Sequence, residues 1–320
     1  MITKDIQLAI NELNRGGIIG MPTETVYGLA ANIYDENAIR KIFALKKRPL
    51  DNPLIVHVSS KERLHELVVD IPDKLSELMS TFCPGPLTFL LKKKPQISNL
   101  ITANLPTVAI RIPNHQLTIE LLDKLEYPLV APSANPFTRV SPTCARHVHN
   151  YFKEELKVVL DGGECLSGLE STIIGYDNDE VIIYRLGAIS KEMLENSIGR
   201  VKIFNANSHN VILTPGMFKR HYSPKTQLIL TSNIQEVLEK NKDLNIAVIS
   251  FLPQLKLNCT EQFYLSKTGD FKEAAKNLYA KLFEMDELKF DLIVAERFPD
   301  VDLGRTINDK LSRAAYKIMV

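Results

Sequence analysis

The sequence predicts an α/β protein built from two domains, and three observations support this prediction. Short apolar and β-branched runs alternate with helical patterns along most of the chain, as they do in sheets covered by helices. The chain has 320 residues, which exceeds the roughly 150 residues of an average domain. A polar, turn-forming stretch at residues 205–225 separates two alternating regions, and we therefore expect it to be a linker.

Residues 1–204 contain the larger set of predicted elements. Apolar residues recur at helical spacing from Ile6 to Leu13, and Gly16 can end that helix before the apolar run Ile18–Met21. The same patterns predict helices at 36–45, 61–68, 73–80 and 116–125, and strands at 54–58, 87–91, 108–112, 129–131, 158–160, 172–175 and 181–184. The close spacing of the last three strands predicts antiparallel or mixed pairing.

Residues 226–320 form the second alternating region. We expect strands at 227–230, 246–251 and 292–295, with helices at 234–240, 271–283 and 306–318. Strands that alternate with helices in this way predict a small, Rossmann-like parallel α/β domain.

Composition excludes several classes of protein. Hydrophobic residues make up 45% of the chain and charged residues 24%, which are the proportions of ordinary globular proteins. No apolar run approaches the roughly 18 residues of a membrane span, and Lys4 and Asp5 lie where a signal peptide is apolar. We therefore expect a cytoplasmic protein that does not contact a membrane. The net charge of +1 provides little long-range attraction for nucleic acid.

No metal-binding pattern is present in the sequence. The cysteines form no CxxC pair and are expected to be inert core thiols: Cys83, Cys144, Cys165 and Cys259. His147 and His149 have no carboxylate or cysteine partner at a useful spacing, so we expect them at the surface. We therefore expect no metal bound by protein side chains alone.

The common phosphate-binding patterns are missing, and polar turns after predicted strands are the candidate site instead. Neither GxxxxGK[ST] nor GxGxxG occurs. The turns are PTETVYGL from Pro22, KKRPLDNPL from Lys46 and APSAN from Ala131. Open α/β sheets bind ligands at such positions. Each turn also has a purely structural interpretation: a capped helix start, a solvated helix end and an ordinary turn, respectively.

Two arginines and one histidine are isolated candidates. Arg111 and Arg185 lie in apolar strands, where an unpaired guanidinium is costly to bury, so each is expected to meet an anion. For His57, at the end of a predicted strand, a structural role is favoured over a catalytic one.

In their order these segments resemble one family, the threonylcarbamoyl-AMP synthases in their longer, two-domain form. The matching motifs are PTETVYGL, KKRPLDNPLIVHV, CPGPLTFLL, VAIRIP, PSAN, STII, VIIYRLG, PGMFKRHYSP and GRTINDKLSRAA. The resemblance implies a catalytic domain at 1–204 with a YrdC-like, twisted open mixed sheet flanked by helices. It also implies a linker that acts as an active-site lid at 205–225 and a smaller α/β domain at 226–320.

The resemblance also implies roles for individual residues. The L-threonine pocket would comprise Thr25, His57, Arg111, Ala131 and Ser171, with Arg111 pairing with the carboxylate of the amino acid. The ATP site would comprise Arg48, Asn52, Thr107, Ser133, Ser141, Arg185 and Tyr222. Catalytic roles would fall to the KxR and SxN patterns formed by Lys46, Arg48, Ser133 and Asn135.

The implied activity is the condensation of L-threonine, bicarbonate and ATP into threonylcarbamoyl-AMP and pyrophosphate. Mg²⁺ would be held mainly by the phosphates, and a downstream tRNA-modifying transferase would receive the adenylate, with a weak direct tRNA contact as a further expectation. Two alternatives remain open. One is a non-catalytic RNA-binding module, against which the near-neutral charge speaks. The other is a related carbamoyl-transferring enzyme, which would carry zinc-finger and acylphosphatase-like segments that we do not find.

Overall fold

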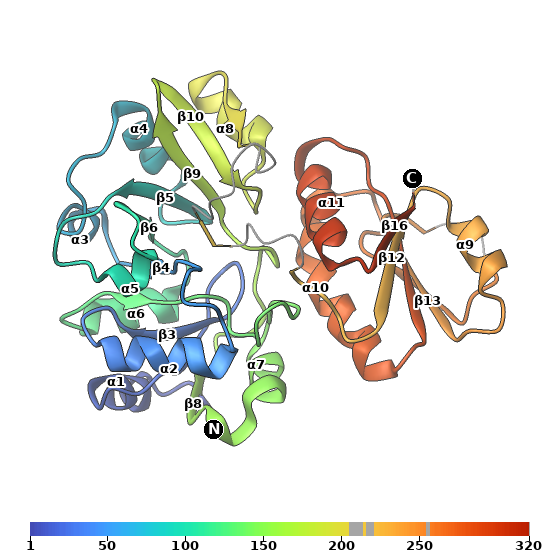
Figure 1. The fold of residues 1–320 in the computed structure, drawn as a ribbon, viewed down its shortest axis with the longest axis horizontal. Coiled ribbons are helices and arrows are strands. Elements are labelled where there is room, and N and C mark those ends of the chain that lie inside the picture. The colour runs from blue at the N-terminus through green and yellow to red at the C-terminus, as the bar shows by residue number, and fades with distance from the viewer. Residues whose placement is uncertain (205–213, 216–220, 254–256, 320) are drawn as a thin grey trace.

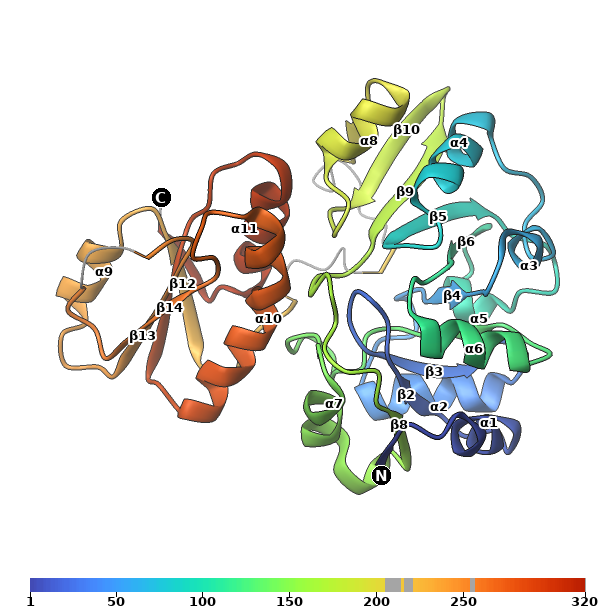
Figure 2. The ribbon, with the colours of Figure 1, turned by 180° about the vertical axis from the view of Figure 1, so that it is seen from behind.

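The computed structural model describes residues 1–204, 214–215, 221–253 and 257–319. Two α/β domains lie side by side, each built around its own sheet (Figure 1, Figure 2). The predicted fold class is confirmed, because the amino-terminal sheet is mixed and the carboxyl-terminal sheet is parallel.

The amino-terminal sheet contains eleven strands among the described residues, in the order β1-β8-β2-β3-β7-β4-β6-β5-β9-β10-β11. Its strands are β1 (Ile2–Thr3), β2 (Ile19–Met21), β3 (Gly28–Asn32), β4 (Ile55–His57), β5 (Leu87–Lys92), β6 (Thr107–Arg111), β7 (Leu129–Val130), β8 (Val158–Leu160), β9 (Thr172–Asp177), β10 (Glu180–Arg185) and β11 (Lys202–Ile203). β4 and β6 pair in parallel, whereas β5 and β6 are antiparallel, as are β9 and β10. The predicted mixed pairing is therefore present.

Helices cover both faces of this sheet. They are α1 (Ile6–Asn14), α2 (Glu36–Lys46), α3 (Lys61–His65), α4 (Asp73–Phe82), α5 (Asn99–Thr102), α6 (Gln116–Lys124), α7 (Ala145–Phe152) and α8 (Lys191–Ile198), with a short 3₁₀ turn at Lys153–Glu155. One apolar cluster joins α1 and α6 to β2, β7 and β8, and a second joins α2 and α4 to β3, β4 and β5.

The ends of α2 show how the local sequence places a functional loop. The Asp35 carboxylate accepts hydrogen bonds from the backbone N–H groups of Asn37 and Ala38 at the start of the helix. Lys47 ends the helix in the left-handed conformation, with φ of 53°. The chain therefore turns sharply at Lys47, and Arg48 leaves the helix axis.

The carboxyl-terminal sheet has the order β14-β13-β15-β12-β16 among the described residues, and every neighbouring pair is parallel. Its elements are β12 (Gln227–Thr231), α9 (Ile234–Lys240), β13 (Ile246–Ser250), β14 (Glu261–Tyr264), α10 (Phe271–Leu288), β15 (Leu292–Glu296), α11 (Asp302–Ala314) and β16 (Lys317–Met319). The prediction of a helix that extends to Ile318 is wrong, because Ala315 is extended and the following residues pair with β12.

The two domains share an apolar contact formed by α10 and α11, which lie on the side of the carboxyl-terminal domain that faces the other domain (Figure 1, Figure 2). The apolar cluster around these helices includes Val26, Val140 and Leu169 of the amino-terminal domain. His147 on α7 is buried and stacks on Phe283 of α10, with ring centroids 3.9 Å apart and planes at 8°. The expectation that His147 lies at the surface is therefore wrong, because its face of α7 packs against α10.

Within the described residues, no helix combines the length and the apolar character needed to cross a bilayer.

Candidate active site

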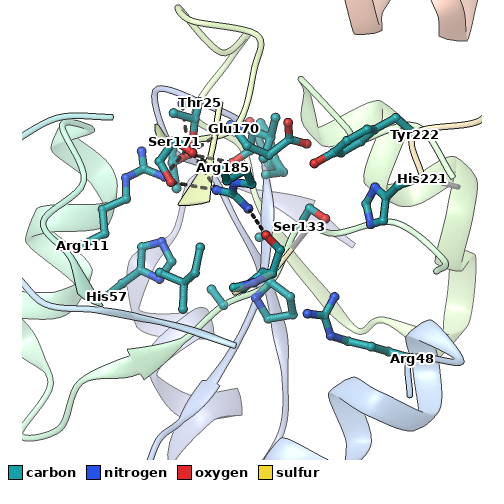
Figure 3. Close-up of a pocket in the computed structure, with 18 residues that line it drawn as sticks. Thr25, Arg48, His57, Arg111, Ser133, Glu170, Ser171, Arg185, His221 and Tyr222 are labelled. Carbon is teal, nitrogen blue, oxygen red and sulfur yellow. Dashed lines mark hydrogen bonds between the residues drawn. The ribbon is translucent and has the colours of Figure 1, made fainter. Parts of the chain in front are cut away.

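A pocket lies in the amino-terminal domain where strand ends, polar turns and two parts of the linker meet (Figure 3). Its empty volume is about 560 Å³, open solvent at the mouth included. The described residues that line it are Thr23, Thr25, Val26, Tyr27, Gly28, Arg48, Ile55, His57, Arg111, Ala131, Pro132, Ser133, Glu170, Ser171, Arg185, Pro215, His221 and Tyr222. All three predicted turns therefore contribute to one pocket.

Strand pairing brings distant candidates together. His57 and Arg111 are register partners at the ends of the parallel strands β4 and β6. Ser171 precedes β9, and Arg185 ends β10. Figure 3 shows His57 and Arg111 on one side of the pocket and Arg48, His221 and Tyr222 on the other. An arginine therefore lies on each of these two sides of the pocket.

Arg111 is held by three groups. Its Nη1 donates to Thr25 Oγ1 at 2.8 Å, and its Nε donates to the Gly85 carbonyl at 3.2 Å. Its Nη2 lies 2.6 Å from Oε2 of Glu24, and both side chains are almost completely buried. The anion expected for this buried arginine is therefore present in the protein itself. These three contacts fix the orientation of the guanidinium.

Arg185 is held in a similar way. Its Nε and Nη2 donate to the Ser171 carbonyl at 3.1 and 2.8 Å, and Nη2 also donates to Ser171 Oγ at 3.0 Å. The Ser171 hydroxyl is hydrogen bonded to Thr88 Oγ1 at 2.7 Å. Ser171 is consequently held between two strands in one orientation.

The loop after α2 carries the third arginine. Arg48 Nη2 donates to the Pro53 carbonyl at 2.7 Å, and Nε donates to the Asn52 carbonyl at 3.3 Å. Burial, together with the nearby positive charge of Arg185, lowers the pKa of Arg48 to about 9. The guanidinium remains charged at neutral pH, and an anion that lies between these arginines would relieve their repulsion.

The histidines of the pocket are neutral at pH 7. Burial and the adjacent Arg111 lower the pKa of His57 to about 3. Burial and Arg48 lower the pKa of His221 well below its usual value. Among the described lining residues Glu170 is the only carboxylate, so the pocket is predominantly cationic. The described residues hold no group of three or more His, Cys, Asp or Glu side chains that could bind a metal ion.

Comparisons with known proteins show the family to which the chain belongs. Residues 11–187 match the family described as "Telomere recombination", and residues 189–316 match "Threonylcarbamoyl-AMP synthase, C-terminal domain". The chain is 37% identical to the threonylcarbamoyl-AMP synthase of Pyrococcus abyssi, over 98% of this chain and 95% of that protein. This chain belongs to the threonylcarbamoyl-AMP synthase family. The Bacillus subtilis synthase is 36% identical, over 95% of this chain and 90% of its own length.

A solved structure extends the similarity to three dimensions. The crystal structure of the Pyrococcus abyssi protein complexed with L-threonine superposes with a TM-score of 0.92 at 36% identity. It covers 98% of this chain and 95% of that chain. The two-domain form of the threonylcarbamoyl-AMP synthases is therefore the architecture of this chain.

Five residues that the synthase resemblance assigned do not line the pocket: Lys46, Asn52, Thr107, Asn135 and Ser141. Thr107 begins β6, four residues before Arg111, and this spacing separates the two by roughly 13 Å. Asn52 is fully buried, and Ser141 lies behind Glu170, to which its hydroxyl donates at 2.6 Å. In this structure none of the three reaches the pocket directly.

Lys46 and Asn135 support the pocket from behind. The Lys46 ammonium donates to the Ser133 carbonyl and, at 2.5 Å, to the Asn135 carbonyl. The Asn135 amide donates to the carbonyls of Pro136 and Arg139. Burial and the nearby Arg48 lower the pKa of Lys46. These two side chains therefore fix the PSAN turn that presents Ser133.

Several lining residues were not predicted from the sequence, among them Glu170 and His221. Glu170 and His221 directly precede the predicted residues Ser171 and Tyr222. A carboxylate next to a predicted ligand-binding serine was therefore a usable signal. No local sequence pattern identified His221, because a linker residue reaches the pocket only through the tertiary arrangement of the chain.

Proposed function

We propose that this chain condenses L-threonine, bicarbonate and ATP into threonylcarbamoyl-AMP and pyrophosphate, which supplies the donor for threonylcarbamoyl modification of adenosine in tRNA. One observation carries the proposal: a single pocket joins a preorganised arginine, Arg111, to a second cationic group formed by Arg48 and Arg185. Such a pocket matches an amino-acid carboxylate at one end and a polyphosphate at the other.

The end of the pocket around Arg111 suits L-threonine. A guanidinium can hold a carboxylate with two parallel hydrogen bonds, and Arg111 is already oriented by Thr25 and Glu24. We assign the threonine site to Thr25, His57, Arg111, Ala131 and Ser171. The neutral His57 ring adds a polar contact without a second positive charge.

The opposite end suits ATP. Arg48 and Arg185 provide charge for the phosphates, and Ser133 and Tyr222 provide hydroxyl groups. Because both oxygens of Glu170 already accept hydrogen bonds from protein hydroxyls, we propose that Mg²⁺ arrives with ATP and is held mainly by its phosphates. Asn52, Thr107 and Ser141 lie outside the pocket lining, so we propose that they contact only a part of ATP that extends beyond it.

The chemistry requires positioning and charge neutralisation. The threonine amine attacks the carbon of bicarbonate, and water leaves, which gives N-carboxythreonine. An oxygen of the new carboxylate then attacks the α-phosphorus of ATP. A P–O bond forms, the bond between the α-phosphorus and the bridging oxygen breaks, and pyrophosphate leaves. Arg48 and Arg185 stabilise the charge on the leaving group, and Lys46 and Asn135 hold the turn that carries Ser133.

The linker at 205–225 is proposed to act as a lid. Pro215, His221 and Tyr222 line the pocket, whereas residues 205–213 and 216–220 lie outside the described part of the chain. A lid would protect the carbamate and the mixed anhydride from water. We propose the boundaries 1–204 for the catalytic domain and 226–320 for the carboxyl-terminal domain.

A downstream tRNA-modifying transferase, a weak tRNA contact and a cytoplasmic location belong to the same proposal. The alternative, a non-catalytic RNA-binding module, is not favoured, because the buried pocket gathers groups for small anions and the net charge is only +1.

A direct assay tests the proposed function. The protein is incubated with ATP, Mg²⁺, bicarbonate and labelled L-threonine, and pyrophosphate and the labelled adenylate are measured. We expect pyrophosphate release that depends on both threonine and bicarbonate. Release of pyrophosphate without threonine would contradict the proposal. Salt-sensitive tRNA binding with no adenylate formed would support the RNA-binding module instead.

A further inference from the structure

The carboxylate of Glu170 connects the pocket to the carboxyl-terminal domain. Its Oε1 accepts a hydrogen bond from Ser141 Oγ at 2.6 Å. Its Oε2 accepts one from the hydroxyl of Tyr279, on α10, at 2.9 Å. Glu170 is 5% exposed and Tyr279 is fully buried. The single carboxylate among the described lining residues is therefore oriented by one group from each domain.

Lys310 on α11 reaches the same wall of the pocket. Its ammonium lies 4.0 Å from Oε2 of Glu170 and donates to the Leu186 carbonyl at 2.8 Å. It also lies 4.9 Å from the centre of the Tyr222 ring. Burial of an ammonium is costly in free energy unless the group is paired and hydrogen bonded. For the buried Lys310, the partners are Glu170, the Leu186 carbonyl, the Tyr222 ring and the carboxylate of Asp309.

Further contacts bind α11 to the chain that follows Arg185. Thr306 Oγ1 donates to the Gly187 carbonyl at 3.2 Å. At Gly187 a Cβ atom would lie only 2.4 Å from the Glu170 carbonyl oxygen, so this segment packs directly on the Glu170–Ser171 backbone. The segment after Arg185 therefore packs against the segment that carries Ser171, and α11 contacts the first of them through Thr306.

Tyr222 completes the network. Its ring stacks on Tyr279, with centroids 5.6 Å apart and planes at 27°. Figure 3 shows the Tyr222 hydroxyl directed toward Glu170 across the pocket. Burial, reinforced by the negative charge of Glu170, raises the pKa of Tyr279 well above its usual value, so its hydroxyl stays protonated and donates.

We propose that Tyr279 and Lys310 are positioning residues for adenylate synthesis, and that they act by holding the Glu170 carboxylate and the Tyr222 ring in the pocket wall. The carboxyl-terminal domain thereby completes the active site of the other domain. This inference rests on the proposed function and deepens it. The charge of Glu170 offsets the repulsion between Arg48 and Arg185. Because Ser141 and Tyr279 hold this carboxylate in the wall, it stays away from the phosphates that the two arginines would bind.

The test compares conservative variants of the full-length protein. Tyr279→Phe removes one hydroxyl without changing the ring, and Glu170→Gln removes the charge while keeping an oxygen acceptor. We expect Tyr279→Phe to lower kcat/KM for pyrophosphate release about tenfold or more, because a hydrogen bond to a charged group is lost. In the double variant, we expect the loss to be no larger than that of Glu170→Gln alone.

Arg305→Gln is the matched control. Arg305 is also on α11 and pairs across the domain contact with Glu192 at 2.9 Å, but neither residue lines the pocket. We expect this variant to keep wild-type kcat/KM. The Tm of every variant is measured by thermal unfolding, so that a loss of activity in a folded variant can be distinguished from a loss of the fold.

The outcomes are distinguishable. If the wild-type protein makes no adenylate, the proposed function fails. If the wild type is active and a folded Tyr279→Phe variant is equally active, the positioning role is overturned. The role is also overturned if the two losses add in the double variant, or if Arg305→Gln loses as much activity as Tyr279→Phe.

Discussion

The carboxylate of Glu24 lies 2.6 Å from the guanidinium of Arg111, and both side chains are buried. Because the pair is formed within the protein, Glu24 compensates the positive charge of Arg111. Nη1 and Nη2 each carry a second N–H that can donate to a substrate carboxylate, while Thr25 holds the group in place. Arg111 therefore has both a structural and a binding role, and variants must separate the two.

Substitutions at this pair are predicted to separate stability from threonine affinity. Arg111→Ala leaves Glu24 buried without a partner, and we expect it to reduce the free energy of unfolding by about 3–5 kcal/mol. The double variant Arg111→Met with Glu24→Gln removes both charges, and we expect it to recover most of that stability. Its affinity for threonine should nevertheless fall at least tenfold, while ATP affinity changes little.

Urea unfolding and isothermal titration calorimetry measure these two quantities. A folded double variant that binds threonine as well as the wild type does would contradict the assignment of Arg111 to the substrate carboxylate.

Substitution of Lys46 is predicted to reduce stability, whereas substitution of Arg48 is predicted to weaken the binding of phosphates. Lys46→Met leaves the carbonyls of Ser133 and Asn135 without their donor, so we expect stability to fall by about 1–3 kcal/mol and Ser133 to lose its position. Arg48 lines the pocket, so Arg48→Gln should weaken binding of pyrophosphate and ATP with a smaller loss of stability. Urea unfolding and calorimetry with pyrophosphate test both. An inactive Lys46→Met variant of wild-type stability would instead place the ammonium in contact with substrate.

Local patterns were sufficient to predict much of the fold and the arginines of the site. Arg111 and Arg185 could be predicted because a charge within an apolar strand requires a partner, whatever the tertiary arrangement. The strands β4, β5, β6 and β8 were predicted from their apolar, β-branched runs. β3, with the sequence GLAAN, was not predicted because it lacks the β-branched residues that mark a strand.

The partners of the site residues could not be predicted, because they depend on contacts between segments far apart in sequence. Glu170 and Tyr279 are separated by 109 residues, and no local pattern relates them. Likewise, His147 was expected at the surface because no metal-binding partner lies near it in the sequence, and no local pattern identifies the helix that covers it. Periodicity predicts which face of an element is buried, whereas it does not identify what covers that face.

Pyrophosphate is predicted to stabilise the fold through the arginines of the pocket. Arg48 and Arg185 lie close enough that their repulsion contributes to the lowered pKa of Arg48, and a polyphosphate relieves this repulsion. At a concentration of 100 Kd the added stability is about 2.7 kcal/mol, which corresponds to a rise in Tm of roughly 5–10 °C. Differential scanning fluorimetry measures the shift, with sodium chloride of equal ionic strength as the control. We expect Arg185→Gln to reduce the shift, and an equal shift with sodium chloride would exclude specific binding.

Buried histidines are predicted to make the protein unstable in mild acid. Burial lowers the pKa of His57 to about 3 and of His147 to about 4, and it lowers the pKa of His221 well below its usual value. Each of these groups is neutral when folded and takes up a proton on unfolding once the pH is below about 6.5. The unfolded state then binds more protons, so stability rises with pH and falls as the pH decreases from 6.5 toward 4. The expected slope approaches about 1.4 kcal/mol per pH unit for each histidine, or about 4 for the three together.

The control for this pH dependence is His147→Phe, which keeps an aromatic ring against Phe283 and lies outside the pocket. Urea unfolding at several pH values between 5 and 7 gives the free energy of unfolding for both proteins. We expect the variant to be less stable at pH 7, because the hydrogen bond from the Thr143 backbone to the imidazole is lost. Below pH 6.5 its free energy of unfolding should nevertheless fall less steeply, because one proton fewer is taken up on unfolding. The difference in slope approaches about 1.4 kcal/mol per pH unit. Equal slopes for the two proteins would show that His147 is already protonated in the folded state, which would contradict the burial of a neutral ring between α7 and α10.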